Sequence, residues 1–393
     1  MSISVQERYF SYNKIILLAV GLWPYQQSQV VRFQTTFFLS ILISFVILML
    51  SRLRFTDYSF EFNIHLLCTS TYFTFLLIKY ISFWLNIETI RYALEQFQDI
   101  YKRLKDSKEI AIYNKYGNIG KRITIALIIV AICNHVYLTA IQCGPYILDM
   151  IIPKNETYAH HFIEVMTNSF AVQEKDFYLF LLHLNAVLAI GSIAFVAVGT
   201  MLLSCFKLIC GMFRIASYRF DRAILATLQS IGLKNETRIY KELIYAVDIH
   251  RKAMQFAKVF VGDMERSLFF VTMITVLCMS LNFYAIFQIE SPVQEIEKIM
   301  GHLLLIIFIF IYMFVANYAG QEITDYNNHM FLTVYNTPWY LAPLQIQKLT
   351  LFLLQRSNKA FALSLGGLFT LSIECFASLV SASVSYCTLM LSF

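Results

Sequence analysis

The sequence predicts an all-α integral membrane protein with seven transmembrane helices, its N-terminus in the cytoplasm and its C-terminus outside. Three observations predict this: the composition is apolar, seven runs are nearly free of charge, and the basic residues lie in alternate segments. Hydrophobic residues make up 58% of the 393 residues and charged residues 14%, whereas a soluble domain carries about 25% charged residues. A chain this apolar cannot bury its side chains in one aqueous core, so we expect several membrane spans.

The charge-poor runs give the positions of the spans. Each is close to or longer than the ~20 residues that cross a bilayer core. Backbone polar groups in lipid must be satisfied within the segment, so we expect helices, and the ten-residue alternation of a β-barrel is missing from the runs. The runs are 33–51, 62–78 (to about 85 if Lys79 snorkels), 123–148, 177–206, 267–289, 299–321 and 360–393, the last interrupted by Glu374.

Lysine and arginine give the orientation. The N-terminal segment and the segments that follow spans two, four and six hold 25 of the 31 basic residues, while the three alternate loops hold five. Because basic residues concentrate on the cytoplasmic side, this division places the N-terminus inside, and seven spans then place the C-terminus outside.

These spans divide the chain into six expected parts. Apolar residues at helical spacing on both sides of Gly232 predict that span four continues into the cytosol as a helix, turns, and returns as a helix into span five. The parts are a cytoplasmic N-terminus with a membrane-associated helix (1–32), spans one to four (33–206), cytoplasmic helical extensions (207–266), spans five and six (267–321), a cytoplasmic anchor helix (322–359), and span seven (360–393).

Motifs of enzymes and cofactor sites are missing from the sequence. Walker loops, GxGxxG, HExxH and GxSxG do not occur, so we expect neither an enzyme nor a cofactor or nucleic-acid partner. Within the predicted spans, His135, His183, His302 and Glu374 could contact a ligand or could bond a neighbouring helix. Asn155 begins a glycosylation sequon in a predicted outer loop.

Motifs near both ends carry a family resemblance. Before the first span stands Gly21-Leu22-Trp23-Pro24, and a longer series occupies the last sixty residues. That series contains Tyr335, Trp339 and Tyr340, then Gln355-Arg356-Ser357-Asn358, Gly366, Gly367, Phe369-Thr370-Leu371-Ser372, Phe376-Ala377-Ser378 and Ser383-Val384-Ser385-Tyr386. In order and spacing it resembles the end of the insect odorant receptors, and span number, topology and length are similar across the whole chain.

The resemblance implies an odorant-gated, poorly selective cation channel in the plasma membrane of olfactory sensory neurons. It implies a tuning subunit that assembles with the shared odorant co-receptor in a tetramer, because the co-receptor's long insertion between spans four and five is missing here. Gustatory receptors share the architecture, but their usual final motif is absent. A secondary transporter is a further alternative, although paired broken helices of inverted repeats are not seen in the sequence.

We expect the odorant to bind in the outer half of the bundle formed by spans two, three, four and six, with span five at its edge. Such a pocket is largely apolar and aromatic, with a few polar groups, and each aromatic side chain could instead pack against lipid or another helix. The expected contacts are Tyr72, Phe73, Asn134, His135, Leu138, Phe180, His183, Leu184, Val187, Phe283, Tyr284 and Tyr312.

The last helix is expected to line the pore. Ser378, Ser381, Ser385 and Ser392 form a weakly polar stripe without fixed charge, which suits hydrated cations or, alternatively, helix packing. By similarity to the co-receptor's closing motif, Leu389 and Phe393 are the expected hydrophobic gate.

The segment before span seven is expected to join the subunits. Its candidate contacts are Trp339, Tyr340, Leu349 and Leu353, because apolar side chains on an inner helix outside the lipid need burial. Packing within the same chain is the alternative for each of them.

Overall fold

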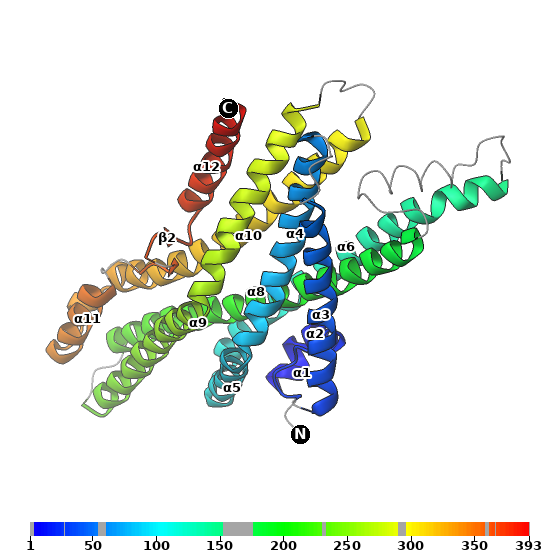
Figure 1. The fold of residues 1–393 in the computed structure, drawn as a ribbon. Coiled ribbons are helices and arrows are strands. Elements are labelled where there is room, and N and C mark those ends of the chain that lie inside the picture. The colour runs from blue at the N-terminus through cyan, green and yellow to red at the C-terminus, as the bar shows by residue number, and fades with distance from the viewer. Residues whose placement is uncertain are drawn as a thin grey trace.

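The computed structural model describes residues 4–26, 28–53, 60–151, 176–229, 233–289, 296–357, 361–365 and 367–392. It is almost entirely helical, and the described N- and C-terminal ends lie at opposite ends of the helix bundle (Figure 1). The elements are α1 (Val5–Tyr9), α2 (Ser11–Ala19), α3 (Gln29–Arg52), α4 (Phe60–Leu85), α5 (Ile87–Arg103), α6 (Ser107–Ile151), α8 (Phe177–Gln229), α9 (Leu233–Phe287), α10 (Ile296–Asn336), η2 (Trp339–Leu341), α11 (Leu344–Ser357), β1 (Ser364–Leu365), β2 (Phe369–Thr370) and α12 (Ile373–Leu391).

Seven helices in the described ranges are long and apolar enough to cross a membrane, which confirms the predicted number of spans. They are α3, α4, α6, α8, α9, α10 and α12. α8 and α9 contain 53 and 55 residues, or about 80 Å each, against about 30 Å for a bilayer core. The helical continuation predicted on both sides of Gly232 is therefore present, and both helices extend well beyond a bilayer.

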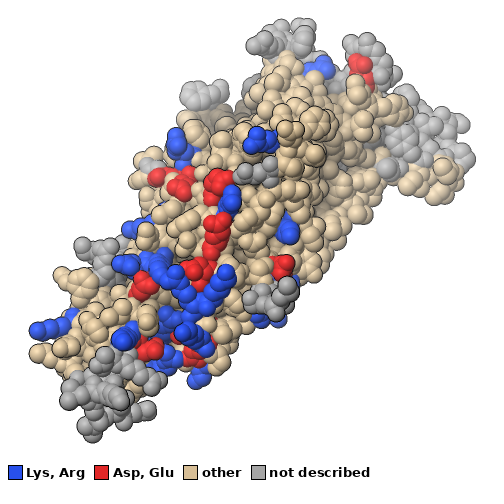
Figure 2. Space-filling view, turned by 90° about the horizontal axis from the view of Figure 1, so that it is seen from below, with Lys and Arg blue, Asp and Glu red and all other residues tan. Residues whose placement is uncertain are grey.

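The charged residues gather where these helices extend toward the N-terminal end of the molecule. Figure 2 shows lysine, arginine and acidic side chains crowded over one part of the lower face and a wide part with few charges beyond it. The guanidinium of Arg219 on α8 donates two hydrogen bonds, of 2.7 and 2.8 Å, to the carboxylate of Glu109 on α6. Arg222, one turn further, contacts Asp106 and donates to Glu242 on α9 at 2.7 Å. These ion pairs join α6, α8 and α9 outside the part with few charges.

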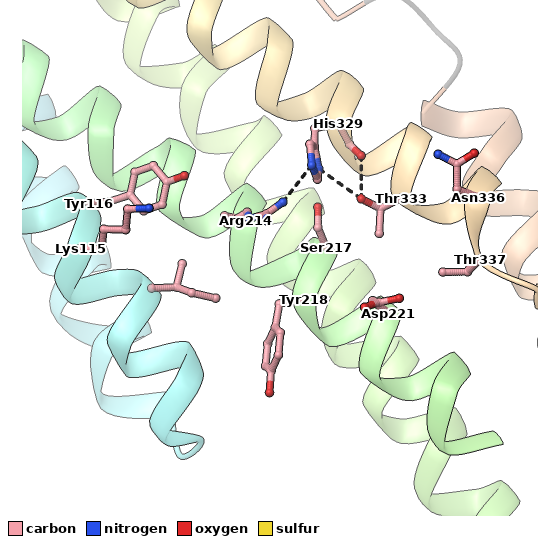
Figure 3. A pocket seen from close by; sticks show the side chains of 11 residues that line it. Lys115, Tyr116, Arg214, Ser217, Tyr218, Asp221, His329, Thr333, Asn336 and Thr337 are labelled. Carbon is pink, nitrogen blue, oxygen red and sulfur yellow. Dashed lines mark hydrogen bonds between the residues drawn. The ribbon is translucent and has the colours of Figure 1, made fainter. Parts of the chain in front are cut away.

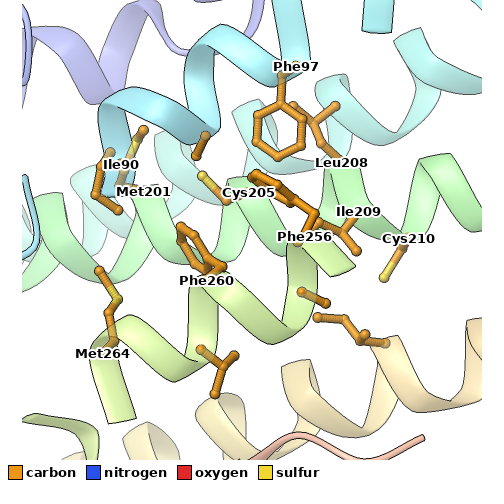
Figure 4. Packing of buried hydrophobic residues seen from close by; sticks show 14 of the residues in the cluster. Ile90, Phe97, Met201, Cys205, Leu208, Ile209, Cys210, Phe256, Phe260 and Met264 are labelled. Carbon is orange, nitrogen blue, oxygen red and sulfur yellow. The ribbon is translucent and has the colours of Figure 1, made fainter. Parts of the chain in front are cut away.

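The largest group of buried apolar residues in the described chain extends from this end of the molecule into the spans. Figure 4 shows Ile90 and Phe97 of α5 facing residues of α8 and α9, among them Met201, Cys205, Phe256 and Phe260. Phe97, Met201 and Cys205 have no exposed surface, and Phe260 is 2% exposed. At about 25 cal/mol per Å² of buried apolar surface, such a core supplies a large share of the folding free energy.

The N-terminal helices are part of this core and do not lie on its surface. Asn13 of α2 is fully buried, and its amide donates to the Thr200 hydroxyl at 2.9 Å. Leu22 and Trp23 of the Gly-Leu-Trp-Pro motif are buried. Gly21 has a φ of +73°, and a Cβ there would lie 2.9 Å from the Thr35 hydroxyl oxygen, so the turn requires glycine.

The charge-free run 360–393 is not one helix. It begins with a short antiparallel hairpin, whose strands β1 and β2 have two residues each and in which Ser364 pairs with Thr370. The turn of the hairpin includes Gly367 at φ +68°. α12 begins only at Ile373, after Ser372 caps its N-terminus by accepting from the Cys375 N–H. Glu374 thus lies in the first turn of α12, where the helix dipole favours a carboxylate, and not deep inside the span.

α10 meets the segment before α12 at a glycine. A Cβ on Gly320 would overlap the side chain of Leu371 and would lie 2.9 Å from its carbonyl oxygen. Leu371 immediately follows β2 and donates its N–H to the Leu363 carbonyl at 2.9 Å. The close approach of α10 to the base of α12 therefore depends on the missing side chain.

Gly320→Ala should destabilise the fold by about 1–3 kcal/mol, because the added methyl group has no space without displacing Leu371. Thermal unfolding of the purified receptor in detergent measures the change. Gly301→Ala is the matched control on the same helix, because a Cβ there has open space and alanine has the higher helix propensity. Equal unfolding temperatures for the two variants would show that the contact of α10 with Leu371 does not depend on glycine at position 320.

Candidate functional site

Eight aromatic side chains pack together between α3, α4, α8 and α10, and we call them the aromatic cluster. The ring centroids of Phe45 and Phe73 lie 4.6 Å apart, and those of Phe195 and Phe308 lie 5.0 Å apart. Tyr72 joins the two halves, because its ring lies 5.4 Å from that of Phe73 and 5.9 Å from that of Phe308. The cluster consists of Phe45, Tyr72, Phe73, Phe75, Phe180, Phe195, Phe308 and Tyr312.

Four of the predicted ligand contacts belong to this cluster: Tyr72, Phe73, Phe180 and Tyr312. Leu184 and Val187, also predicted, are buried on α8 in the same apolar core. The other four cluster residues were not among the predicted contacts. For two of them, Phe75 and Phe308, the signal was helical spacing. Phe75 follows Tyr72 by three residues and Phe308 precedes Tyr312 by four, which places each pair on one helix face.

His183 bonds a neighbouring helix. Its Nε2 lies 3.1 Å from the Ser44 hydroxyl and 3.2 Å from the Ile41 carbonyl of α3. Its ring meets that of Phe45 edge-on at 5.2 Å. The side chain therefore fixes α8 against α3 at the border of the aromatic cluster.

The predicted contacts on α6 lie apart from the cluster. α6 packs chiefly along α8, and Figure 1 shows the two helices diverging together from α4 and α10. Asn134 is exposed, and His135 and Leu138 are half-buried. Of the 18 most apolar consecutive residues of this helix, only 6% are buried, the smallest share among the seven candidate spans.

The predicted contacts on α9 belong to two smaller groups of buried apolar residues. Phe283 packs against a small apolar group that also borders Tyr72 and Tyr312. Tyr284, 8% exposed, packs with Ile64, Cys68 and Cys387 instead. Near them the His302 Nδ1 lies 2.9 Å from the Asn282 amide oxygen, so this histidine too ties two helices together.

One lysine is buried beside the aromatic cluster. Lys79 on α4 is 4% exposed, and its ammonium nitrogen lies 4.5 Å from the ring centroid of Tyr312. This geometry is a cation–π contact. The side chain does not reach the surface, contrary to the snorkelling considered from the sequence.

α12 has one covered face and one open face. Leu379, Ser383 and Cys387 recur every four residues, are buried, and lie on the side that packs against α9 and α10. The predicted pore residues lie on other sides of the helix and are all exposed: Ser378, Ser381, Ser385, Leu389 and Ser392. Phe393 lies outside the described residues, as does Asn155.

The predicted assembly residues divide between the two sides of the segment from η2 to α11. Leu353 is 3% exposed, and Trp339 and Leu349 pack half-buried against the chain's own core. Tyr340 is exposed. Beside it lies a row of exposed apolar side chains that was not predicted, made of Leu341, Leu344, Leu351 and Phe352.

A polar cavity of about 560 Å³ lies between α6, α8 and α10 outside the charge-free spans. In Figure 3, Arg214 and Thr333 both point to His329 at its rim. The Arg214 guanidinium donates to the His329 Nε2 at 2.9 Å. Burial, and then the charge of Arg214, lower the pKa of His329, which keeps the imidazole neutral and able to accept this hydrogen bond. The described residues contain no group of three His, Cys, Asp or Glu side chains that could hold a metal ion.

Comparisons with known proteins identify the family. The model of the family described as 7tm Odorant receptor matches residues 59–384. The structure of the insect olfactory receptor OR5 from Machilis hrabei in complex with eugenol has a TM-score of 0.74 and 13% identity, and the match covers 98% of each chain. A second structure of that receptor has a TM-score of 0.72 with the same identity and coverage. None of the curated proteins matches the sequence. A match over most of the chain shows that this protein belongs to the insect odorant receptor family, and the solved structures show that it has the fold of that family.

Proposed function

We propose that this chain is the odorant-binding subunit of a ligand-gated, poorly selective cation channel. Its partners are copies of the shared odorant co-receptor in a tetramer, and its place is the plasma membrane of olfactory sensory neurons. Family membership over residues 59–384 carries the proposal. The complex of a similarly folded receptor with eugenol supports a small-molecule ligand for this chain as well.

The proposed orientation has the N-terminus in the cytoplasm and the C-terminus outside. The division of lysine and arginine between alternate segments supports it. The charged region and the polar cavity then lie in the cytosol, and the aromatic cluster lies among the spans. Asn155 in this orientation is an extracellular glycosylation site.

The proposed odorant site is the aromatic cluster with the neighbouring Leu184 and Val187. Its surface is almost wholly apolar, as pockets for small organic ligands are. His183 borders it and Phe283 lies at its α9 edge, while Tyr284 packs in a separate apolar group and stays a predicted contact. Asn134, His135 and Leu138 on α6 stay predicted contacts that mutation can test separately.

The channel activity is tested by co-expressing this chain with the co-receptor and recording current under voltage clamp during application of a panel of volatiles. A ligand-gated channel gives an inward current that depends on both subunits. Saturable uptake of the volatile without current would replace the proposal with a transporter.

Tyr72→Ala and Phe195→Ala should each raise the half-maximal agonist concentration about 10- to 200-fold and change the rank order of agonists, because each removes apolar contact worth ~1–3 kcal/mol. Dose–response curves measure the change. Phe33→Ala removes a ring that is 72% exposed and should have no effect. Leu138→Ala in the same assay tests whether α6 contributes. Unchanged sensitivity in both cluster variants would place the odorant elsewhere.

Ser385→Cys and Leu389→Cys should make the current sensitive to a thiol reagent applied from outside, since both positions are on the open face of α12. Ser383→Cys is the control on the covered face, fully buried in the same helix, and should react much more slowly. The unmutated receptor sets the background from its native cysteines. Equal reaction at Ser383→Cys and Ser385→Cys, or no effect at Ser385 and Leu389, would remove α12 from the pore lining.

Phe352→Ala and Leu353→Ala, at neighbouring positions, should have opposite effects. Phe352 is 65% exposed, so its loss should reduce co-purification with the co-receptor and leave the thermal stability of this chain unchanged. Leu353 is buried in its own chain, so its loss should cost about 2–5 kcal/mol of folding stability. Intact assembly with Phe352→Ala would show that this row of side chains does not form the subunit contact.

A further inference from the structure

Lys79 is a buried lysine for which the described part of the chain provides no carboxylate partner. The described ion pairs involve other residues, and the Tyr312 ring is the one partner that the structure gives to the Lys79 ammonium. A membrane-spanning lysine that is 4% exposed would ordinarily pair with a carboxylate or extend to water. A cation–π contact offsets only part of the cost of removing an ammonium from water.

The side chain is directed into the aromatic cluster and away from the nearer helix end. α4 ends at Leu85, only six residues after Lys79. Side chains on a helix tilt toward its N-terminus, and the Tyr312 ring under the ammonium is 5.1 Å from Phe75, one turn before Lys79. The ammonium therefore lies over the Tyr312 ring. That ring packs against Phe75 and Phe195, where α4, α8 and α10 meet.

We infer that Lys79 is the polar anchor of the odorant site and that the receptor takes odorants with an acceptor oxygen at one end. This inference rests on the proposed function and adds the chemical class of the ligand. The ammonium has three N–H donors and no acceptor, so it would bind a carbonyl or carboxylate oxygen while the rings cover the apolar chain of the same molecule. Hydrocarbons leave the donors unsatisfied, and amines place a second positive charge beside the first.

The test uses the full-length receptor co-expressed with the co-receptor. Three volatiles of equal chain length are compared: a hydrocarbon, a methyl ketone and a carboxylic acid. Lys79→Met keeps the length and apolar volume of the side chain but removes the donors, and Lys79→Arg keeps the charge. Lys258→Met is the matched control, because Lys258 also lies over an aromatic ring, that of Phe361 at 5.5 Å, but is exposed and outside the cluster.

Wild-type receptor should respond to the ketone or the acid at lower concentration than to the hydrocarbon. Lys79→Met should raise the half-maximal concentration of the oxygenated ligands by about 10- to 100-fold, because a site built to bond a polar group discriminates strongly, and should leave the hydrocarbon response nearly unchanged. Lys79→Arg and Lys258→Met should keep the wild-type order.

An equal shift for all three ligands in Lys79→Met, or no shift, would overturn the inference while the proposed function stands. A wild-type receptor with its lowest half-maximal concentration for the hydrocarbon would also overturn the inference. A receptor that reaches the surface with the co-receptor and conducts with none of a broad volatile panel would instead contradict the proposed function. If Lys79→Met does not reach the surface, Lys79→Gln is compared with Lys79→Arg. Glutamine keeps N–H donors but lacks the charge, so the inference requires a weaker acid response in Lys79→Gln than in Lys79→Arg.

Discussion

The backbone's need for hydrogen bonds inside a bilayer is the constraint on which the rest of this structure depends. In hydrocarbon each N–H and C=O must find a partner within its own segment, so every candidate span is a helix. Once formed, α8 and α9 continue through the charged region without a break in their described parts. Within the spans, α8 carries Phe180 and Phe195 of the aromatic cluster, and α9 carries Phe283 beside it. Closer to the charged end, both helices carry residues of the large apolar core. Packing at one level sets the geometry at the other, because a helix transmits a displacement along its length.

α10 has a particular position in this arrangement. It carries Phe308 and Tyr312 of the aromatic cluster, and two turns after Tyr312 it touches the base of α12 at Gly320. Two residues further, Glu322 accepts a hydrogen bond of 2.7 Å from Lys207 of α8, in an ion pair whose side chains are 15% and 17% exposed. Breaking a mostly buried pair is costly, so α10 is held to α8 beside its contact with Leu371. In the proposed channel, a ligand that moves Tyr312 would therefore act on the hairpin before α12 through a short and stiff stretch of one helix.

The spans were predictable from the sequence because charge is excluded from lipid, and the runs free of charge record that exclusion directly. The hairpin before α12 was not, because its residues are as apolar as those of a span, and only Gly366-Gly367 signalled a break. The faces of α11 could not be assigned either. Leu353 and Phe352 are equally apolar in the sequence, and which one turns inward is decided by the placement of α10 and η2. Half of the residues in the aromatic cluster were predicted, because the depth of a residue in the membrane can be estimated from the ends of its span. Phe45 and Phe195 were not predicted, because they join the cluster through the way α3 and α8 pack across α4. From the sequence alone, Lys79 is only an interruption of a span, because its burial depends on how the helices pack.

In the proposed pore, the serine hydroxyls on the open face of α12 would favour cations over anions. Ser378 donates its hydroxyl hydrogen to the Glu374 carbonyl at 3.0 Å, and Ser385 donates to that of Ser381 at 2.9 Å. Ser392 does the same toward Leu389 at 2.7 Å. Each hydroxyl has one hydrogen to donate, so once it is used within the helix, the oxygen lone pairs are what remains for the surroundings. In the proposed pore, a stripe of such oxygens presents acceptors and no donors, which suits cations with part of their hydration shell and not anions. Glu374, in the first turn of α12, is the one carboxylate on this face of the described helix. From Ser378 onward the face carries hydroxyl oxygens without a fixed charge, so in the proposed pore the attraction there is weak and similar for different cations.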